Sequence, residues 1–195
     1  MTTTLPKVPE TCAIAFKEWE GICAALAEGR QALILRKGGI AEGPGGFRPE
    51  HEAFWLYPTR LHEGQQGLAV EPPTPVGPPP GEPEMVPLRS LAVVASIDYL
   101  ERPESLEALA PYHLWTEETV RKRFFYRRPG LWVLGVRVYN RPTPWPVAVT
   151  PEQRGCKTWV PLDNPPPTAG LVPALEDVAF HRQIEAIRDA LGRTP

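Results

Sequence analysis

The sequence predicts a single α/β domain of the mixed α+β kind, in which helices flank one mixed β-sheet. Its 195 residues, of which 42% are hydrophobic and 23% charged, suit one well-buried core. Apolar runs with strand character alternate with segments of helical period in the order helix, strand, strand, strand, helix, strand. An accessory strand and a C-terminal helix follow. This order is not a regular strand–helix–strand repeat, so we expect a mixed sheet in one domain spanning residues 1–195.

The first part of the chain predicts one helix and two strands. A helix is expected from Thr11 to Glu28, because apolar residues recur there at three- and four-residue spacing. These residues are Cys12, Phe16, Trp19, Cys23 and Leu26. A short buried strand is expected at 32–35, followed by a glycine-rich loop at 38–46. The aromatic run at 53–57 predicts a second strand.

A proline-rich segment separates these elements from the rest. The stretch Glu71–Pro87 holds eight prolines in seventeen positions. Because proline lacks the backbone N–H and fixes its φ angle, we expect an extended polyproline II loop or insert and no central strand. Such a segment is either a stiff connector or a ligand for an aromatic groove of another protein.

The second half predicts the remaining elements. The run 91–100 predicts a strand, and 105–110 and 117–126 predict helices, the second with Thr116 as its N-cap. The Val- and aromatic-rich run 131–139 predicts a strand that leads into a proline-dense loop. An edge strand is expected at 157–161. A closing helix is then expected at 174–191, with four apolar residues inward: Val178, Ile184, Ile187 and Leu191.

Composition indicates a cytoplasmic protein. Three cysteines (Cys12, Cys23, Cys156) are an odd number, which favours reduced thiols over a disulfide framework. No apolar stretch approaches the ~20 residues of a membrane span, and no signal peptide is evident, so we expect no membrane partner. The 26 prolines and the scarcity of Asn and Met resemble thermophile composition, although a GC-rich genome would produce a similar bias.

A basic strip between Glu118 and Glu152 is the strongest functional signal. It contains no acidic residue and seven basic ones, with six aromatic residues interleaved, in a chain whose net charge is −2. The basic residues are Arg121, Lys122, Arg123, Arg127, Arg128, Arg137 and Arg141. Uncompensated positive charge with aromatic side chains is typical of a surface that binds nucleic-acid phosphates and stacks on bases. Pairing with acidic groups elsewhere in the chain is the structural alternative.

An enzyme is a second interpretation. The predicted order of elements is also that of the restriction-endonuclease-like core, in which carboxylates hold Mg²⁺ or Mn²⁺ against a phosphodiester. Glu18, Glu52 and Asp98 are the candidate catalytic residues, and Glu52 and His62 the candidate metal ligands. The acidic-x-lysine motif of that core is absent. No cofactor is expected unless this alternative holds.

Two further positions have the chemistry for a site. The run Arg36–Gly39 follows a predicted strand and combines cations with glycines, which suits phosphate binding, although it is no Walker A motif. Cys156 lies between Arg154 and Lys157, where neighbouring cations lower a thiol pKa. Its role is open.

Several stretches of this sequence resemble a mostly bacterial family known as domain of unknown function 1802. They include 15–19, 29–40, 52–59 with His62, 113–116, 123–124, 134–139 and 155–160. The resemblance implies no activity; an association of the family with restriction-endonuclease domains suggests a role in DNA restriction. The polar residues of these stretches are more often cationic than anionic, which favours an anion-binding cleft.

We therefore expect a nucleic-acid- or phosphate-binding accessory protein linked to DNA restriction or maintenance, with DNA or RNA as partner. The expected binding residues are Lys17, Arg36, Lys37, His113, Arg123, Phe124, Arg137, Lys157 and Trp159. The alternatives are a divergent metal-dependent phosphodiesterase, or a protein-interaction module that presents its proline-rich segment.

Overall fold

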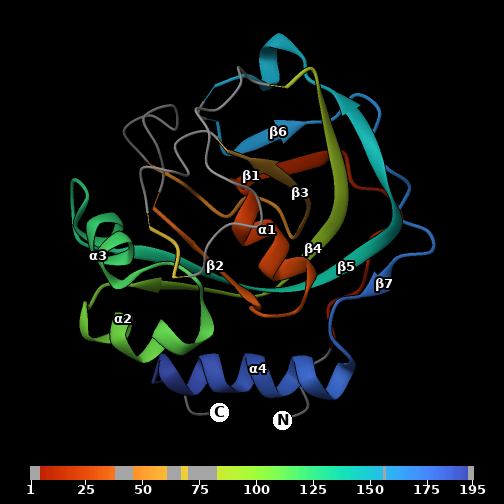
Figure 1. The fold of residues 1–195 in the computed structure, drawn as a ribbon. Helices are drawn as coiled ribbons and strands as arrows, with labels where there is room; N and C mark the ends of the chain where they lie inside the picture. Colours follow the sequence, from red (N-terminus) through yellow and green to blue (C-terminus); the bar gives the residue numbers. More distant parts are fainter. Residues whose placement is uncertain (1–4, 38–45, 61–66, 70–82, 156, 193–195) are drawn as a thin grey trace.

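A strongly curved mixed sheet forms the centre of the protein (Figure 1). The computed structural model describes residues 5–37, 46–60, 67–69, 83–155 and 157–192. The strands are β1 (Ile14–Trp19), β2 (Leu33–Arg36), β3 (Ala53–Thr59), β4 (Met85–Leu100), β5 (Leu131–Ala148), β6 (Trp159–Pro161) and β7 (Val172–Pro173). The helices are α1 (Glu20–Ala27), α2 (Glu104–Leu109), α3 (Glu117–Phe125) and α4 (Asp177–Ala190), with short 3₁₀ turns at Ala110–Tyr112 and Pro151–Gln153.

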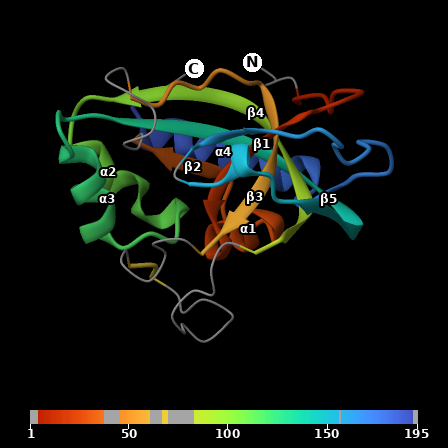
Figure 2. The same ribbon diagram turned by 90° about the horizontal axis from the view of Figure 1, so that it is seen from above.

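Within the described residues, the strands join in one sheet with the order β2-β5-β4-β3-β1-β6, and β7 adds to β5. The β1–β3 pair is parallel and every other pair is antiparallel. The prediction of a mixed sheet flanked by helices is therefore confirmed. Helix α1 lies within the curve of the sheet, and α2 and α3 stand together at one end (Figures 1 and 2).

Two apolar clusters cover the two faces of the sheet. The larger contains Phe16, Phe54 and Ala92 and receives the four helices. The smaller contains their alternating neighbours, such as Ala15 and Trp55. This split follows from the strand geometry, in which successive side chains point to opposite faces. Strand β1 is consequently buried on both faces.

The predicted helix at 11–28 is wrong in its first half, because Ile14–Trp19 is strand β1 and the helix begins at Glu20. Apolar residues at helical spacing also occur by chance in a strand whose two faces are both buried. The described order of elements thus begins with a strand, unlike the order expected for a restriction-endonuclease-like core. Cys12 and Cys23 belong to different clusters, and both are free thiols.

Both long strands extend into segments expected to be proline-containing loops. Met85–Pro87 pairs with Pro146–Ala148, so the end of the proline-rich segment is strand and not polyproline II. Residues 71–82 of that segment lie outside the described residues. The register jumps between Leu88–Trp145 and Ser90–Asn140, and such irregular or edge positions tolerate proline.

Helices α2, α3 and α4 and the edge strand β6 confirm the predicted elements in the second half. The expectation that Val178 points inward is wrong, since its side chain is 71% exposed. Helix α4 buries Phe180, Ile184 and Ile187, and a residue two positions before Phe180 points to the opposite side of a helix. Among the described residues, no helix is long and apolar enough to cross a membrane.

Candidate anion-binding site

Strand β1 brings two charged side chains into the interior, one on each face. Lys17, an expected binding residue, and Glu18, a candidate catalytic residue, are 7% and 1% exposed. The Lys17 ammonium donates to the Gly155 carbonyl at 2.9 Å and lies 5.4 Å from the Tyr57 ring. Glu18 lies on the opposite face, the one that carries Phe16.

Arg36, at the end of β2, reaches the Phe16–Glu18 face. Its guanidinium lies 5.2 Å from the centre of the Phe16 ring and donates to the Thr158 hydroxyl. The β1–β6 pairing sets Trp159 opposite Phe16, and the two rings meet edge to face at 4.9 Å. Trp159 also stacks on Phe47 at 5.7 Å. Arg36 thus lies over the Phe16 ring, which packs with the rings of Trp159 and Phe47.

Arg123 projects from α3 towards the same face. Its guanidinium lies 4.4 Å from the Trp19 ring and 5.3 Å from the Trp115 ring, and it donates to the Leu35 carbonyl at 3.1 Å. Burial lowers the pKa of Arg123 to about 10, the Glu18 carboxylate opposes this shift, and the Arg36 charge adds to it. Arg123 therefore keeps its charge at neutral pH.

Glu18, Arg36 and Arg123 form what we call the inner cluster. One Glu18 carboxylate oxygen accepts the Trp19 backbone N–H at 2.8 Å. The other has no hydrogen-bond partner in the part of the chain that the structure describes. Two guanidinium groups accompany one carboxylate, so these three side chains sum to a charge of +1. Glu18 is buried and the two arginines are half-buried, so this excess of positive charge is partly withdrawn from water and favours an anion.

His113 borders the inner cluster through Trp115, whose ring centre is 5.6 Å from its own. Burial lowers the pKa of His113 to about 4, and the nearby Arg123 charge contributes to that shift. His113 is therefore neutral at pH 7. Within the described residues, the Trp115 indole N–H has no hydrogen-bond partner.

The end of α3 presents the most accessible part of the basic strip. We call Arg121, Phe125, Tyr126, Arg127 and Arg128 the α3 tip. Phe125 and Tyr126 are 47% and 43% exposed, and the three arginines are exposed. The Arg121 guanidinium lies 5.8 Å from the Phe125 ring and the Arg127 guanidinium 5.2 Å from the Tyr126 ring. Exposed rings beside exposed cations suit a ligand that has both phosphates and bases.

Lys37 connects the inner cluster to the α3 tip. It follows Arg36, and its ammonium donates to the carbonyls of Phe124 at 3.1 Å, Gly130 at 2.5 Å and Arg128. Lys37 thereby caps the C-terminal end of α3, where free carbonyls gather. Burial lowers its pKa, and the Arg128 charge adds to this effect.

The other predicted binding residues lie apart from the inner cluster. Arg137 is buried on β5 and pairs with Asp177 at the start of α4. Lys157 donates to the Glu152 carbonyl at 2.9 Å. Phe124 is fully buried, so the accessible ring at this place belongs to Phe125.

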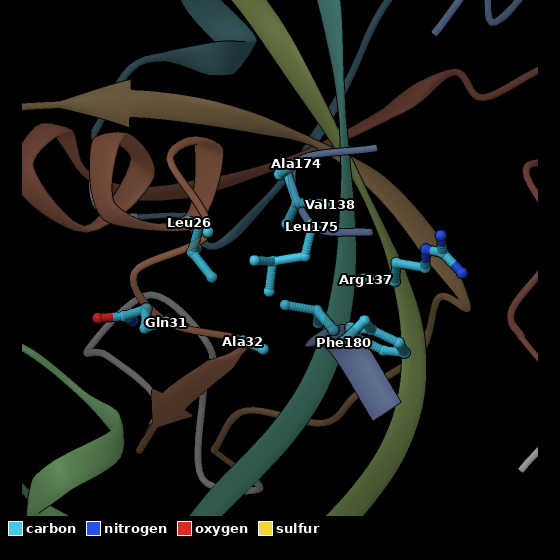
Figure 3. A pocket seen from close by; sticks show the side chains of 10 residues that line it. Leu26, Gln31, Ala32, Arg137, Val138, Ala174, Leu175 and Phe180 are labelled. Carbon is cyan, nitrogen blue, oxygen red and sulfur yellow. The ribbon is translucent and has the colours of Figure 1, made fainter. Parts of the chain in front are cut away.

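A small cavity lies between β5, α1 and α4, bordered by Leu26, Val138, Leu175 and Phe180 (Figure 3). Its volume is about 10 Å³, hardly enough for one water molecule. The Arg137 side chain points away from it (Figure 3). This cavity is a packing gap and not a ligand site.

The candidate catalytic residues are dispersed. Glu52 is exposed before β3, Asp98 is buried on β4, and Glu18 belongs to the inner cluster. No group of three or more His, Cys, Asp or Glu side chains that could hold a metal occurs in the described ranges. His62 and Cys156 lie outside the described residues.

The sequence analysis did not identify Trp19 and Trp115 as residues of this site. Both lie in stretches that resemble the family, but Trp19 was assigned to a helix face and Trp115 to no element. The expected binding residues include Phe124 but neither Phe125 nor Tyr126, although all three are aromatic residues of the strip. The i, i+4 spacing of Arg121 and Phe125 was the available signal for the exposed face.

The fold and the site define an α+β domain with a half-buried cationic cluster and an exposed basic-aromatic tip. A family model described as "Domain of unknown function (DUF1802)" matches residues 15–186. The chain therefore belongs to this family, as the resemblance of its motifs indicated.

Other comparisons add distant likenesses. No match was found among curated proteins. Among solved structures, the chain is similar to a mutant form of ZmASCH from Zymomonas mobilis, with a TM-score of 0.45 and 11% identity over 91% of this chain and 98% of that one. The unmutated ZmASCH structure gives a TM-score of 0.45 and 10% identity over 88% of this chain and 93% of that one.

Proposed function

We propose that this protein binds nucleic acid through the α3 tip, with the inner cluster as an additional site for a phosphate group. The observation on which this rests is the exposure of three arginines and two aromatic rings at the end of one helix. The nearby Lys122 is partly neutralised by Glu118, whose carboxylate is 2.6 Å away. Residues 119–151 contain no acidic side chain, so the acidic residues nearest to the tip in sequence are Glu118 and Glu117, three and four positions before Arg121.

The charge of the inner cluster supports the same function. Arg36 and Arg123 outnumber Glu18, and their guanidinium groups are fixed by aromatic rings and by hydrogen bonds to Thr158 and Leu35. Planar guanidinium groups held in this way match the geometry of phosphate oxygens. Arg123 lies on the same helix as the α3 tip, so one bound polymer could engage both.

A role in DNA restriction or maintenance is the biological setting that we propose for this binding. It rests on the association suggested by the family resemblance. Deleting the gene from a host that restricts foreign DNA tests it: we expect more efficient transformation by unmodified plasmid, restored by the wild-type gene. Unchanged transformation would contradict this setting but leave nucleic-acid binding open.

Binding is tested directly by fluorescence anisotropy with labelled DNA and RNA over a range of salt concentrations. The three tip arginines alone give a slope of log K against log salt of about −2 on single strands and about −3 on duplex DNA, and a phosphate held by the inner cluster steepens it by about 0.7 or 0.9. The triple variant Arg121→Ala, Arg127→Ala, Arg128→Ala should lose most of the affinity and flatten the slope.

Arg30→Ala is the matched control, because it removes an exposed arginine that pairs with Glu28 away from α3. It should bind like the wild type. The same reactions with added Mn²⁺ reveal cleavage products if the phosphodiesterase interpretation holds. Absence of salt-sensitive binding to every nucleic acid at low salt would overturn the proposed function.

A further inference from the structure

We propose that the α3 tip is a preorganised platform for single-stranded nucleic acid and that Lys37 is its positioning residue. This inference rests on the proposed function and names the class of ligand. The decisive feature is that the tip offers two accessible ring faces in addition to charge. Phosphate contacts alone would serve duplexes and single strands alike.

The two rings favour unpaired bases. Phe125 and Tyr126 are consecutive, and about half of each residue's surface is exposed. Each ring has an arginine within 6 Å, so a base stacked on the ring would have its phosphate near a guanidinium. Bases inside a duplex are already stacked on their neighbours, whereas single-stranded bases have free faces.

The backbone beneath the rings is tightly folded. The Arg128 N–H donates to the Tyr126 carbonyl at 2.8 Å, and the Gly130 N–H donates to the Phe124 carbonyl at 3.1 Å. Arg127 adopts a left-handed conformation with φ of 62°, which is uncommon for a residue other than glycine. A strained residue persists where its surroundings hold it, and such positions gather at functional sites.

Lys37 keeps the turn around Arg127 in this conformation. The C-terminal end of a helix carries partial negative charge, which repels a phosphate chain. The Lys37 ammonium binds three carbonyls at this end, those of Phe124, Arg128 and Gly130. It neutralises the helix end and fixes the turn that displays the rings. Since its hydrogen bonds are directed at carbonyls, it acts on the ligand through the tip.

The class of ligand is tested with the full chain and labelled single-stranded DNA, single-stranded RNA and duplex DNA of one sequence. Phe125→Ala with Tyr126→Ala removes the rings and keeps every charge. We expect the Kd for both single strands to rise by about 5- to 150-fold for each stacked base lost, and the Kd for duplex to change less than about 2-fold. Met85→Ala, which truncates another exposed apolar residue, is the control.

The outcomes separate this inference from the proposed function. If the Phe125→Ala, Tyr126→Ala variant binds single strands and duplex with equally reduced affinity, or with unchanged affinity, the single-strand platform is overturned. Salt-dependent binding by the wild type would still support the proposed function. Wild-type protein that binds none of the three ligands would remove both. A difference between the DNA and RNA arms identifies the natural strand.

The part of Lys37 is tested by Lys37→Met on single-stranded DNA. A positioning residue should weaken binding and reduce the quenching of tyrosine fluorescence by bases, while the salt slope keeps its wild-type value. A lysine that itself bound phosphate would instead lower the slope by about 0.7. Lys37→Arg should restore binding in part, and circular dichroism confirms that each variant is folded. A reduced slope, or wild-type binding by Lys37→Met, would overturn the positioning role.

Discussion

Replacing Asp177 with Asn is expected to destabilise the protein more than replacing its partner Arg137 with Met, although each change removes the same ion pair. The two side chains differ in burial, since that of Arg137 is 4% exposed and that of Asp177 is 61% exposed. Asp177→Asn leaves a buried guanidinium without its carboxylate. Arg137→Met leaves a carboxylate that water can solvate.

The burial of the guanidinium sets the magnitude. Removing one partner of a fully buried pair costs about 3–5 kcal/mol, whereas an exposed pair contributes about 0–1 kcal/mol. Asp177 is largely exposed, and the Arg137 guanidinium retains the Tyr139 and Phe180 rings at 5.2 and 5.3 Å. We therefore expect Asp177→Asn to lower the free energy of unfolding by about 2 kcal/mol. Met keeps much of the contact with both rings, so Arg137→Met should cost about 1 kcal/mol or less.

Urea unfolding measures both losses. With an m-value of about 2 kcal/mol/M, Asp177→Asn should lower the midpoint by about 1 M. The double variant should match Arg137→Met within about 0.5 kcal/mol, because the remaining carboxylate is largely exposed and has lost its ion-pair partner. Glu185→Gln, an exposed change on the same helix, is the control. A larger loss for Arg137→Met than for Asp177→Asn would refute the reasoning.

Two further predictions concern backbone space and pH. An Ala side chain at Gly130 would place its Cβ 2.0 Å from the Tyr99 hydroxyl at a φ of 134°, so Gly130→Ala should lower the free energy of unfolding by at least about 2 kcal/mol. Gly170 has a φ of 74° and nothing within 4 Å of its added Cβ, so Gly170→Ala should lower it by about 1 kcal/mol. Equal shifts in melting temperature for the two variants would contradict the clash. The pKa of His113 is about 4, below about 6.5 in the unfolded chain, so the unfolded state binds more protons at pH 5 and this group removes about 2 kcal/mol of stability between pH 7 and pH 5. In urea unfolding, the free energy of unfolding of His113→Gln should fall by about 2 kcal/mol less than that of the wild type between pH 7 and pH 5. An equal fall in both proteins would count against a buried neutral imidazole.

The elements that sequence reasoning predicted well have local signals. Helix α3 begins at Glu117 as expected, and the predicted N-cap is present, since the Thr116 hydroxyl accepts the Thr119 N–H at 3.3 Å. Buried Ile184 and Ile187 on α4 follow from their spacing. These features depend on residues three or four positions apart, which a single sequence displays directly.

Strand β1 shows why the rest could not be predicted. Its sheet neighbours β3 and β6 are distant in sequence, and the two apolar clusters on its faces leave Ile14–Trp19 almost entirely buried. Lys17 and Glu18 interrupt the apolar run, so the local pattern does not indicate that both side chains are buried. Their burial depends on partners such as the Gly155 carbonyl, which lies 138 positions away. The same holds for the inner cluster: Glu18, Arg36 and Arg123 come from β1, β2 and α3 and meet only in the folded protein.

The density of the basic strip overstated the size of the surface available to a ligand. Arg137 pairs with Asp177, Lys122 pairs with Glu118, and Arg141 donates to the Pro167 carbonyl. Arg123 is half-buried against the rings of Trp19 and Trp115.

The remaining three arginines of the strip belong to the α3 tip, and this division has a measurable consequence. If all seven cations contacted phosphates, the salt slope on single-stranded DNA would be about −5; contact through the tip alone gives about −2. Measuring that slope on the wild-type chain distinguishes a local site from a continuous surface. A value near −5 would require Arg137 and Arg141 to leave their partners, contrary to the arrangement described.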